Sequence, residues 1–340
     1  MKPTIYDVAN EAGVSISTVS KVLNNTGSIA EKTRKKVRDT MRELNYQPSV
    51  VASVKKRIQT IGLLIPNIAN PFMAEIARNI ENHVKKFGFS LMICSTDNDL
   101  KNEIEYISIL KQKYIDGIII ATGLKEDKAI KELLKAEIPV ALLSRDVSLL
   151  SVDAVLVDDF LGGYEATEYL ISLGHQRIAI VTEDINFPTI RARFEGYKQA
   201  LEKAGLEYDE SLVSLNNTSL DEGKQSTREL LNLSVPPTAI FASTEFLAIG
   251  AIRGARELKV KVPQDLSIIG FDDTVLATIC DPPLTTIAQP IHEMSKKVVE
   301  LLIEEIEKPK ETKQRIVLSP KLVVRESTSH NKMGTCKETK

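Results

Sequence analysis

The sequence predicts an α + α/β protein: a three-helix N-terminal head, a hinge, and a large α/β body with two subdomains. Three observations predict this class. Apolar residues recur at helical spacing through the first 45 positions. From Ile61 onward, short apolar runs alternate with amphipathic stretches, as in a parallel sheet covered by helices. The alternation starts again near Ala154, which indicates a second wound unit.

The first two helices are the part of the head whose sequence indicates a function. The first helix has a buried stripe of Ile5, Val8, Ala9 and Ala12 and is expected to end at Gly13. Ser15 is placed to cap the second helix. That helix is expected to bury Val19, Val22 and Leu23, and to expose Ile16, Ser17, Ser20 and Lys21. A polar, basic outer face after a short turn indicates a helix-turn-helix that binds DNA. The alternative is an ordinary helical hairpin without a partner.

A third helix is expected from Glu31 to Leu44, with Ala30 as a poor capping residue at its start. Pro48 ends the head, because proline disfavours helical geometry in the residue before it. We therefore expect the DNA-binding domain at 1–47 and the hinge at 48–60.

The body, expected at 61–327, is read as alternating strands and helices. Its first unit has expected strands at 61–65, 90–95, 117–121 and 140–143, with helices at 72–87, 101–113 and 127–136. The second has strands at 154–157, 178–182, 212–215, 239–242 and 267–271, with helices at 162–173, 189–204, 220–231 and 246–257. A helix at 290–306 and one or two edge strands within 314–325 close the body. The subdomains are expected at 61–157 plus 290–318 and at 158–289 plus 319–327, before a flexible tail at 328–340. Two wound units create a cleft at the carboxyl ends of their strands, where small ligands bind.

Charge is divided unevenly along the chain. The whole sequence has 44 Lys and Arg against 46 Asp and Glu, yet residues 1–60 have eleven against five. A basic head on an acidic body suggests that only the head meets a polyanion.

Several classes of protein are excluded by what the sequence lacks. Without a run of eighteen apolar residues or a hydrophobic signal segment, a cytoplasmic protein is expected. Cys94, Cys280 and Cys336 are far apart, which fits reduced thiols better than disulfides or a metal site. There is no P-loop, dinucleotide-binding glycine motif or nucleophile elbow. We expect no enzyme activity, no cofactor and no metal.

The order and spacing of short motifs resemble the LacI family of bacterial transcription regulators over nearly the whole chain. In the head the matching runs are YDVA (6–9), AGVS (12–15), TVSKVLN (18–24) and NYQP (45–48). In the body they are NPF (70–72), DGII (116–119), GH (174–175), Arg193 before GY (196–197), GFDD (270–273) and PPLTTI (282–287).

The resemblance implies a periplasmic-binding-protein-like body that holds a small effector, and a homodimer on a near-palindromic operator. It implies that Ile16, Ser17 and Lys21 contact bases. Phosphates or nearby DNA would be contacted by Thr4, Tyr6, Ser15, Thr18, Ser20 and Asn24. The implied function is a repressor of carbohydrate catabolism genes, bound to the nucleoid when on DNA.

The hinge departs from the family pattern. Relatives have a leucine three residues after the alanine that matches Ala52, and two such leucines wedge into the minor groove. Lys55 stands there in this chain, after Val54. Either Val54 is a smaller wedge or the DNA kink is reduced. We expect a smaller bend than relatives give.

Six residues are expected to bind the effector: Asn70, Phe72, Ser144, Arg193, Thr244 and Asp272. A guanidinium such as that of Arg193 suits hydroxyl pairs or a carboxylate, and Asp272 would accept hydrogen bonds from hydroxyls. Phe72 is either a stacking surface for a sugar or a core aromatic. Thr244-Glu245 replaces a common Asn-Asp pair and Ser144 replaces a common Asp. Loss of an acceptor beside a retained Arg193 favours a sugar acid, and the chain resembles regulators of pectin and hexuronate use. The competing function is a cytoplasmic sugar-binding or sugar-processing protein with an incidental N-terminal bundle.

Overall fold

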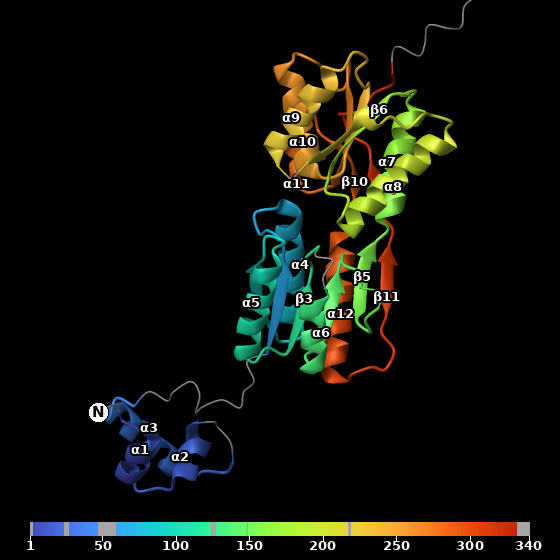
Figure 1. The fold of residues 1–340 in the computed structure, drawn as a ribbon. Helices are drawn as coiled ribbons and strands as arrows, with labels where there is room; N and C mark the ends of the chain where they lie inside the picture. Colours follow the sequence, from blue (N-terminus) through green and yellow to red (C-terminus); the bar gives the residue numbers. More distant parts are fainter. Residues whose placement is uncertain are drawn as a thin grey trace, which may run out of the picture. The chain divides into compact units, whose positions relative to one another are not determined.

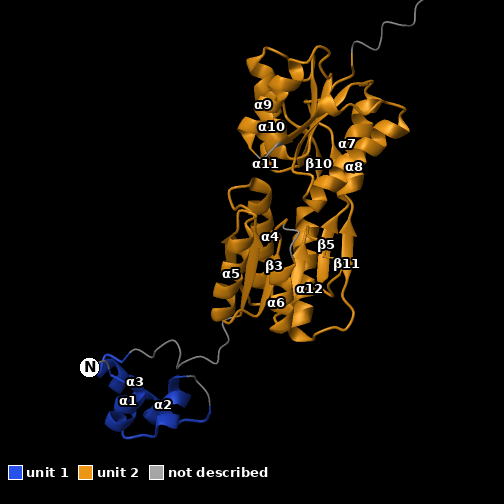
Figure 2. Cartoon of the chain, in the orientation of Figure 1, with its two compact units in different colours: residues 1–58 blue, residues 59–340 orange. Residues whose placement is uncertain are grey.

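The computed structural model of the chain describes residues 3–23, 27–46, 59–123, 127–147, 149–216 and 219–331. The chain divides into two compact units, 1–58 and 59–340 (Figure 2). Asn24, Val54, Lys55, Cys336 and nearly all of the hinge lie outside the described residues. Within them, no helix is long and apolar enough to cross a membrane.

The first unit contains three helices, α1 (Ile5–Ala12), α2 (Ile16–Leu23) and α3 (Glu31–Glu43). Three of the four residues of the predicted stripe, Val8, Ala9 and Ala12, are buried and pack with Val19 and Val22, and Ile5 is half-buried against them. Gly13 ends α1 in the left-handed conformation, with φ of 60°. Ser15 caps α2, since its Oγ accepts from the Thr18 N–H at 3.2 Å. Ala30 gives α3 no side-chain cap, as expected.

The second unit is built on two six-stranded sheets (Figure 1). The first sheet has the strand order β11-β5-β4-β3-β1-β2 and is parallel throughout. Its strands are β1 (Thr60–Ile65), β2 (Ser90–Ser95), β3 (Gly117–Ile120), β4 (Val140–Leu143), β5 (Asp153–Val157) and β11 (Arg315–Leu318). Helices α4 (Pro71–Lys86) and α12 (Ile291–Glu307) share one core with this sheet. Helices α5 (Leu100–Gln112) and α6 (Lys128–Lys135) share the other.

The second sheet has the order β12-β10-β9-β8-β6-β7, and only β12 is antiparallel to its neighbour. Its strands are β6 (Ile178–Glu183), β7 (Val213–Asn216), β8 (Ala239–Ala242), β9 (Ser267–Asp272), β10 (Thr285–Ala288) and β12 (Lys321–Val323). One core includes α7 (Asp159–Ser172) and α8 (Pro188–Lys203). The other includes α9 (Leu220–Leu231), α10 (Glu245–Glu257) and the short α11 (Val275–Ile279). A 3₁₀ turn at Glu210–Leu212 precedes β7.

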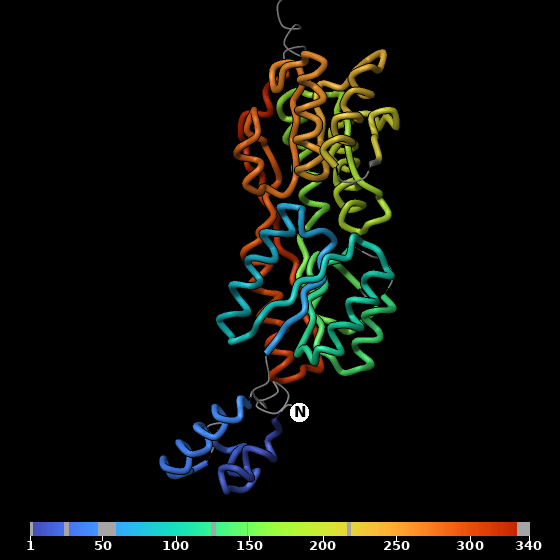
Figure 3. Tube along the Cα trace, turned by 90° about the vertical axis from the view of Figure 1, so that its left-hand side faces the viewer, coloured from blue at the N-terminus to red at the C-terminus, as the bar shows by residue number. Residues whose placement is uncertain are grey.

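The chain passes between the two sheets at residues 158, 289–290 and 319–320 (Figure 1 and Figure 3). Val157 pairs with Leu318 on one side of these crossings, and Ala288 pairs with Lys321 on the other. The three connections therefore form one narrow strip, which we call the crossover strip.

Two features of the second sheet differ from the sequence-based expectation. The stretch before α12 contains α11 and β10, neither of which was expected there. Helix α7 begins at Asp159 rather than Gly162, because the Asp158 side chain accepts from the Leu161 N–H at 2.9 Å. Gly162 is then interior to the helix, where an added Cβ would lie 2.7 Å from the Phe271 ring. Close packing explains this glycine, which reads as a helix start in the sequence.

Candidate DNA-binding face and ligand cleft

The outer face of α2 has the composition that the sequence predicts. Ile16, Ser17 and Lys21 are exposed, and Ile16 has 40% of its surface accessible. Thr18 and Ser20 are half-buried. The Ser15 hydroxyl lies 2.8 Å from the Ser17 hydroxyl and 2.9 Å from that of Thr18. A row of hydroxyls at the start of α2 and the Lys21 cation in its last turn can bond phosphates and base edges.

Thr4 and Tyr6 lie at the start of α1. Thr4 caps the helix in a capping box with Asp7, and its hydroxyl donates to Asp7 Oδ2 at 2.7 Å. These hydrogen bonds from Thr4 lower the pKa of Asp7. Tyr6 has 63% of its surface exposed. Thr4 therefore has a structural task beside any contact with DNA, whereas Tyr6 is open to a partner.

The six predicted effector residues all line one cavity of about 330 Å³ in the second unit. Its walls are the segments that follow the carboxyl ends of the strands in both sheets. Asn70 caps α4, because its Oδ1 accepts from the Phe72 N–H at 3.0 Å. Phe72 belongs to the core of the first sheet, is 6% exposed and also lines the cavity. Ser144 lies at a left-handed turn with φ of 52°.

Arg193 is buried in α8 and held on several sides. Its Nε donates to Asp159 Oδ1 at 2.7 Å, and its Nη1 donates to the Ser243 carbonyl at 2.6 Å. Its guanidinium carbon lies 3.5 Å from the centre of the Phe271 ring. This fixed guanidinium can offer its remaining N–H groups to a ligand without rearrangement.

Asp272 ends β9 beside this guanidinium, with 4.0 Å between its Oδ1 and Nη1 of Arg193. Oδ1 accepts from Gln289 Nε2 at 2.7 Å, and the carboxylate also accepts from the Glu245 N–H. Burial raises the pKa of Asp272 and of Asp159, and the charge of Arg193 opposes both shifts.

Thr244 is a buried residue with an unused polar group. Its Oγ1 finds no hydrogen-bond partner among the described residues, although Thr244 lines the cavity. A buried hydroxyl without a partner costs about 1–3 kcal/mol. A ligand hydroxyl in the cavity could satisfy it.

Several cavity residues were missed by sequence reasoning, chiefly Asp159, Glu183, Phe187 and Gln289. Asp159 and Gln289 adjoin or lie in the crossover strip, which only the fold defines. Asp159 lies between the expected strand at 154–157 and the expected helix at 162–173, so the sequence analysis treated it as part of a connection. Glu183 at the end of β6 had a usable signal, since a polar residue ending a buried strand points to the cleft edge.

The cavity has more carboxylates than cations. Its described lining includes Asp97, Asp159, Glu183 and Asp272 but only one cationic side chain, that of Arg193. No three His, Cys, Asp or Glu side chains in the described ranges are grouped to hold a metal ion. Carboxylates, amides and one guanidinium suit a ligand with many hydroxyl donors.

Comparison with known proteins identifies the families that these two parts of the chain match. Residues 4–49 match the model of bacterial regulatory proteins of the lacI family, and residues 167–328 match a periplasmic binding protein-like domain. The HTH-type transcriptional regulator DegA of Bacillus subtilis strain 168 is 48% identical over 97% of this chain and 99% of its own length.

Two solved structures are similar as well. A LacI family regulator of Enterococcus faecium with bound ribose is 38% identical, with a TM-score of 0.74, over 81% of this chain and all of its own. The lac repressor dimer bound to operator and an anti-inducer is 29% identical, with a TM-score of 0.80, over 97% of this chain and all of its own.

Proposed function

The chain belongs to the LacI family of bacterial transcription regulators, and on this basis we propose that it represses carbohydrate catabolism genes under the control of a sugar effector. It is a DNA-binding regulator and not an enzyme. One observation carries the effector part of the proposal: six residues expected from separate segments line a single cavity with a fixed arginine.

On DNA, Ile16, Ser17 and Lys21 read bases in the major groove, with the Lys21 ammonium donating to guanine and Ile16 touching a thymine methyl. Phosphates are held by Ser15, Thr18, Ser20 and Asn24, and Thr4 and Tyr6 contact nearby DNA. Val54 and Lys55 meet the minor groove between the two halves of the operator. The exposure of Ile16, Ser17 and Lys21 supports this assignment.

The acting form is a homodimer on a near-palindromic operator, in the cytoplasm and on the nucleoid. The lac repressor relative, a dimer bound to operator, supports this assembly. Two copies of α2 would then enter successive major grooves.

The effector is a neutral sugar rather than a sugar acid. The sequence favoured an acid because the cleft seemed to have lost a carboxylate acceptor, at Ser144, while it kept Arg193. Asp159 supplies that acceptor at 2.7 Å, and Glu183 and Asp97 add negative charge to the cavity. A ligand carboxylate would meet this excess of like charge in a half-buried site, which disfavours binding. The relative with bound ribose also supports a neutral sugar.

Two steps test the function. Operator DNA is selected from a pool of random duplexes on the immobilised protein, and its affinity is measured by fluorescence anisotropy. Neutral sugars and the matching sugar acids are then screened by thermal shift, and each hit is retested on operator affinity. We expect one neutral sugar to raise the Tm and change operator affinity in the wild type but not in Arg193→Ala. Failure to select any preferred sequence would refute DNA-binding regulation.

A further inference from the structure

The turn that follows β9 is strained. Asp272 and Asp273 both have positive φ, at 101° and 65°, and neither is glycine. Such conformations cost of order 1–3 kcal/mol each and persist only where the surrounding structure holds them. This turn connects the effector cavity, through Asp272, to α11 through Thr274.

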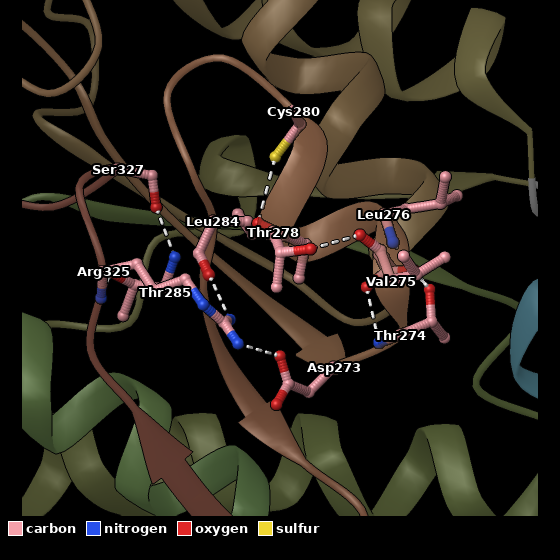
Figure 4. Close-up of polar contacts among 12 residues, drawn as sticks. Asp273, Thr274, Val275, Leu276, Thr278, Cys280, Leu284, Thr285, Arg325 and Ser327 are labelled. Carbon is pink, nitrogen blue, oxygen red and sulfur yellow. Dashed lines mark hydrogen bonds and ion pairs between the residues drawn. The ribbon is translucent and has the colours of Figure 1, made fainter.

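Glu245, the first residue of α10, holds both ends of the turn. Its backbone N–H donates to the Asp272 carboxylate. Its side chain accepts from the Thr274 N–H at 2.9 Å and from the Thr274 hydroxyl. Thr274 in turn caps α11, accepting from the Leu276 N–H at 3.2 Å. Figure 4 shows this turn, with Thr274 beside the start of α11 and Asp273 directed to Arg325.

We propose that Glu245 is a positioning residue for the effector site: it clamps the strained turn at Asp272–Thr274 by holding the Asp272 carboxylate and both donors of Thr274. The proposal rests on the proposed function, because Asp272 is one of the residues assigned to the effector. Its consequence is that the cavity wall and α11 keep their arrangement only while Glu245 holds both ends of the turn.

The charges around Glu245 explain why a proton on its carboxyl group stabilises the folded state. The side chain is only 3% exposed. Asp272 and Asp273 face it from the end of β9, and the Cys280 thiol is a further titratable neighbour after α11. The two cations nearby pair with other carboxylates, Arg193 with Asp159 and Asp272, and Arg325 with Asp273. Ionised Glu245 would therefore add a further negative charge beside Asp272 and Asp273.

Burial, followed by the charges of Asp272 and Asp273, raises the pKa of Glu245 to about 7, although the Thr274 hydrogen bonds oppose the shift. The unfolded chain has the ordinary value of 4.5. The folded state therefore binds this proton more tightly. Its stabilising effect is complete below pH 4.5 and is lost as the pH rises through about 7.

Hydrogen–deuterium exchange tests the clamp on the full-length protein. Glu245→Ala removes both acceptors of Thr274 and is expected to speed exchange in residues 272–281 about tenfold at pH 7, the effect of losing one to two net hydrogen bonds. Glu245→Gln keeps the shape and an acceptor without the charge, and its exchange should stay within about twofold of wild type. If Glu245→Ala does not fold, Thr274→Val removes the hydroxyl half of the clamp and should give an intermediate increase. Unchanged exchange in the folded variant would overturn the clamp.

A pH profile of thermal unfolding tests the proton. Between pH 5 and 8 the Tm of the wild type should fall relative to that of Glu245→Gln by about 3 °C. Glu257→Gln is the matched control, because Glu257 lies in the same helix and its ion pairs with Lys224 and Arg228 lower its pKa. Its Tm difference from wild type should not change over this range. Parallel profiles for wild type and Glu245→Gln would overturn the role of the proton. Neither measurement uses DNA or effector, so a failed operator selection would refute the proposed function alone.

Discussion

Nε of Arg193 donates to Oδ1 of Asp159 at 2.7 Å, and this ion pair joins two helices of the second sheet at the wall of the cavity. Both side chains are buried. A buried ion pair is costly to break on one side, since the remaining charge has lost its partner.

Asp159→Ala should therefore lower the free energy of unfolding by about 3 kcal/mol, as measured by urea denaturation. Asp272, at 4.0 Å, is a weaker substitute partner for Arg193. Glu195→Ala is the control, because Glu195 is exposed on the same helix as Arg193 and should change stability by about 0.5 kcal/mol or less. A loss below about 1 kcal/mol for Asp159→Ala would mean that the pair contributes little.

Gly163→Ala should be destabilising by about 3 kcal/mol or more. A Cβ on Gly163 would lie 2.1 Å from the Arg193 carbonyl oxygen, and backbone atoms cannot move aside as a flexible side chain can. The same substitution should weaken sugar binding, because α7 and α8 must separate and carry Arg193 with them. Gln199→Ala, on the exposed face of α8, is the comparison in urea unfolding. Near-equal stabilities would contradict the close approach.

Lys21→Ala should weaken binding to the selected operator by about 1–3 kcal/mol, and binding to random DNA much less, both measured by anisotropy at one salt concentration. Lys32→Ala is the control, because Lys32 is exposed in α3 and lies outside the outer face of α2. Equal losses on both DNAs would assign Lys21 to a phosphate instead.

Lys55 stands where relatives have a leucine, so we expect this chain to bend DNA less than those relatives do. Circular-permutation electrophoresis on the selected operator measures it. Lys55→Leu should increase the bend, because it restores the apolar wedge that unstacks a base step. A wild-type bend as large as that of Lys55→Leu would show that the hinge needs no leucine.

His175 should make the body sensitive to mild acid. Its Nδ1 lies 2.9 Å from the Thr238 hydroxyl and its Nε2 lies 3.0 Å from the Ser267 hydroxyl, and burial lowers its pKa below 6.5. Stability from the neutral ring is present above pH 6.5 and is lost as the pH falls through the lower folded value. The urea midpoint should decrease more between pH 7.5 and pH 5.0 for the wild type than for His175→Gln. Parallel midpoints would contradict a buried neutral ring.

Much of the molecule follows from local sequence. The strands at 90–95, 140–143 and 239–242 have the expected bounds, because short apolar runs flanked by polar turns are strong signals; the last two are buried throughout. Strand β10 was missed because two prolines precede it and its pairing with β9 and β12 joins distant segments. Its formation depends on tertiary contacts that no short window contains.

The residues of the cavity were likewise only partly predictable from the sequence. Family motifs led to Arg193 and Asp272, which line it together. They did not lead to Asp159, whose importance is a distance to another helix. In the sequence, Glu245 stood out only as part of the Thr244-Glu245 pair that replaces Asn-Asp, just before the expected helix at 246–257. Its contact with Thr274 exists only because the chain reverses after β9.

The crossover strip determines which motion the body can make. Two subdomains joined by a single flexible connection can rotate about any axis. Three connections that lie side by side restrict the rotation, so that bending about the line of the strip is the easiest movement. Asp159 and Gln289 are at this line and are displaced least by bending, whereas Asn70 and Phe72 are on the first sheet's far arm of the cavity. Bending at the strip would therefore change the distance from Asn70 and Phe72 to Asp159 and Gln289, across the cavity that all four residues line.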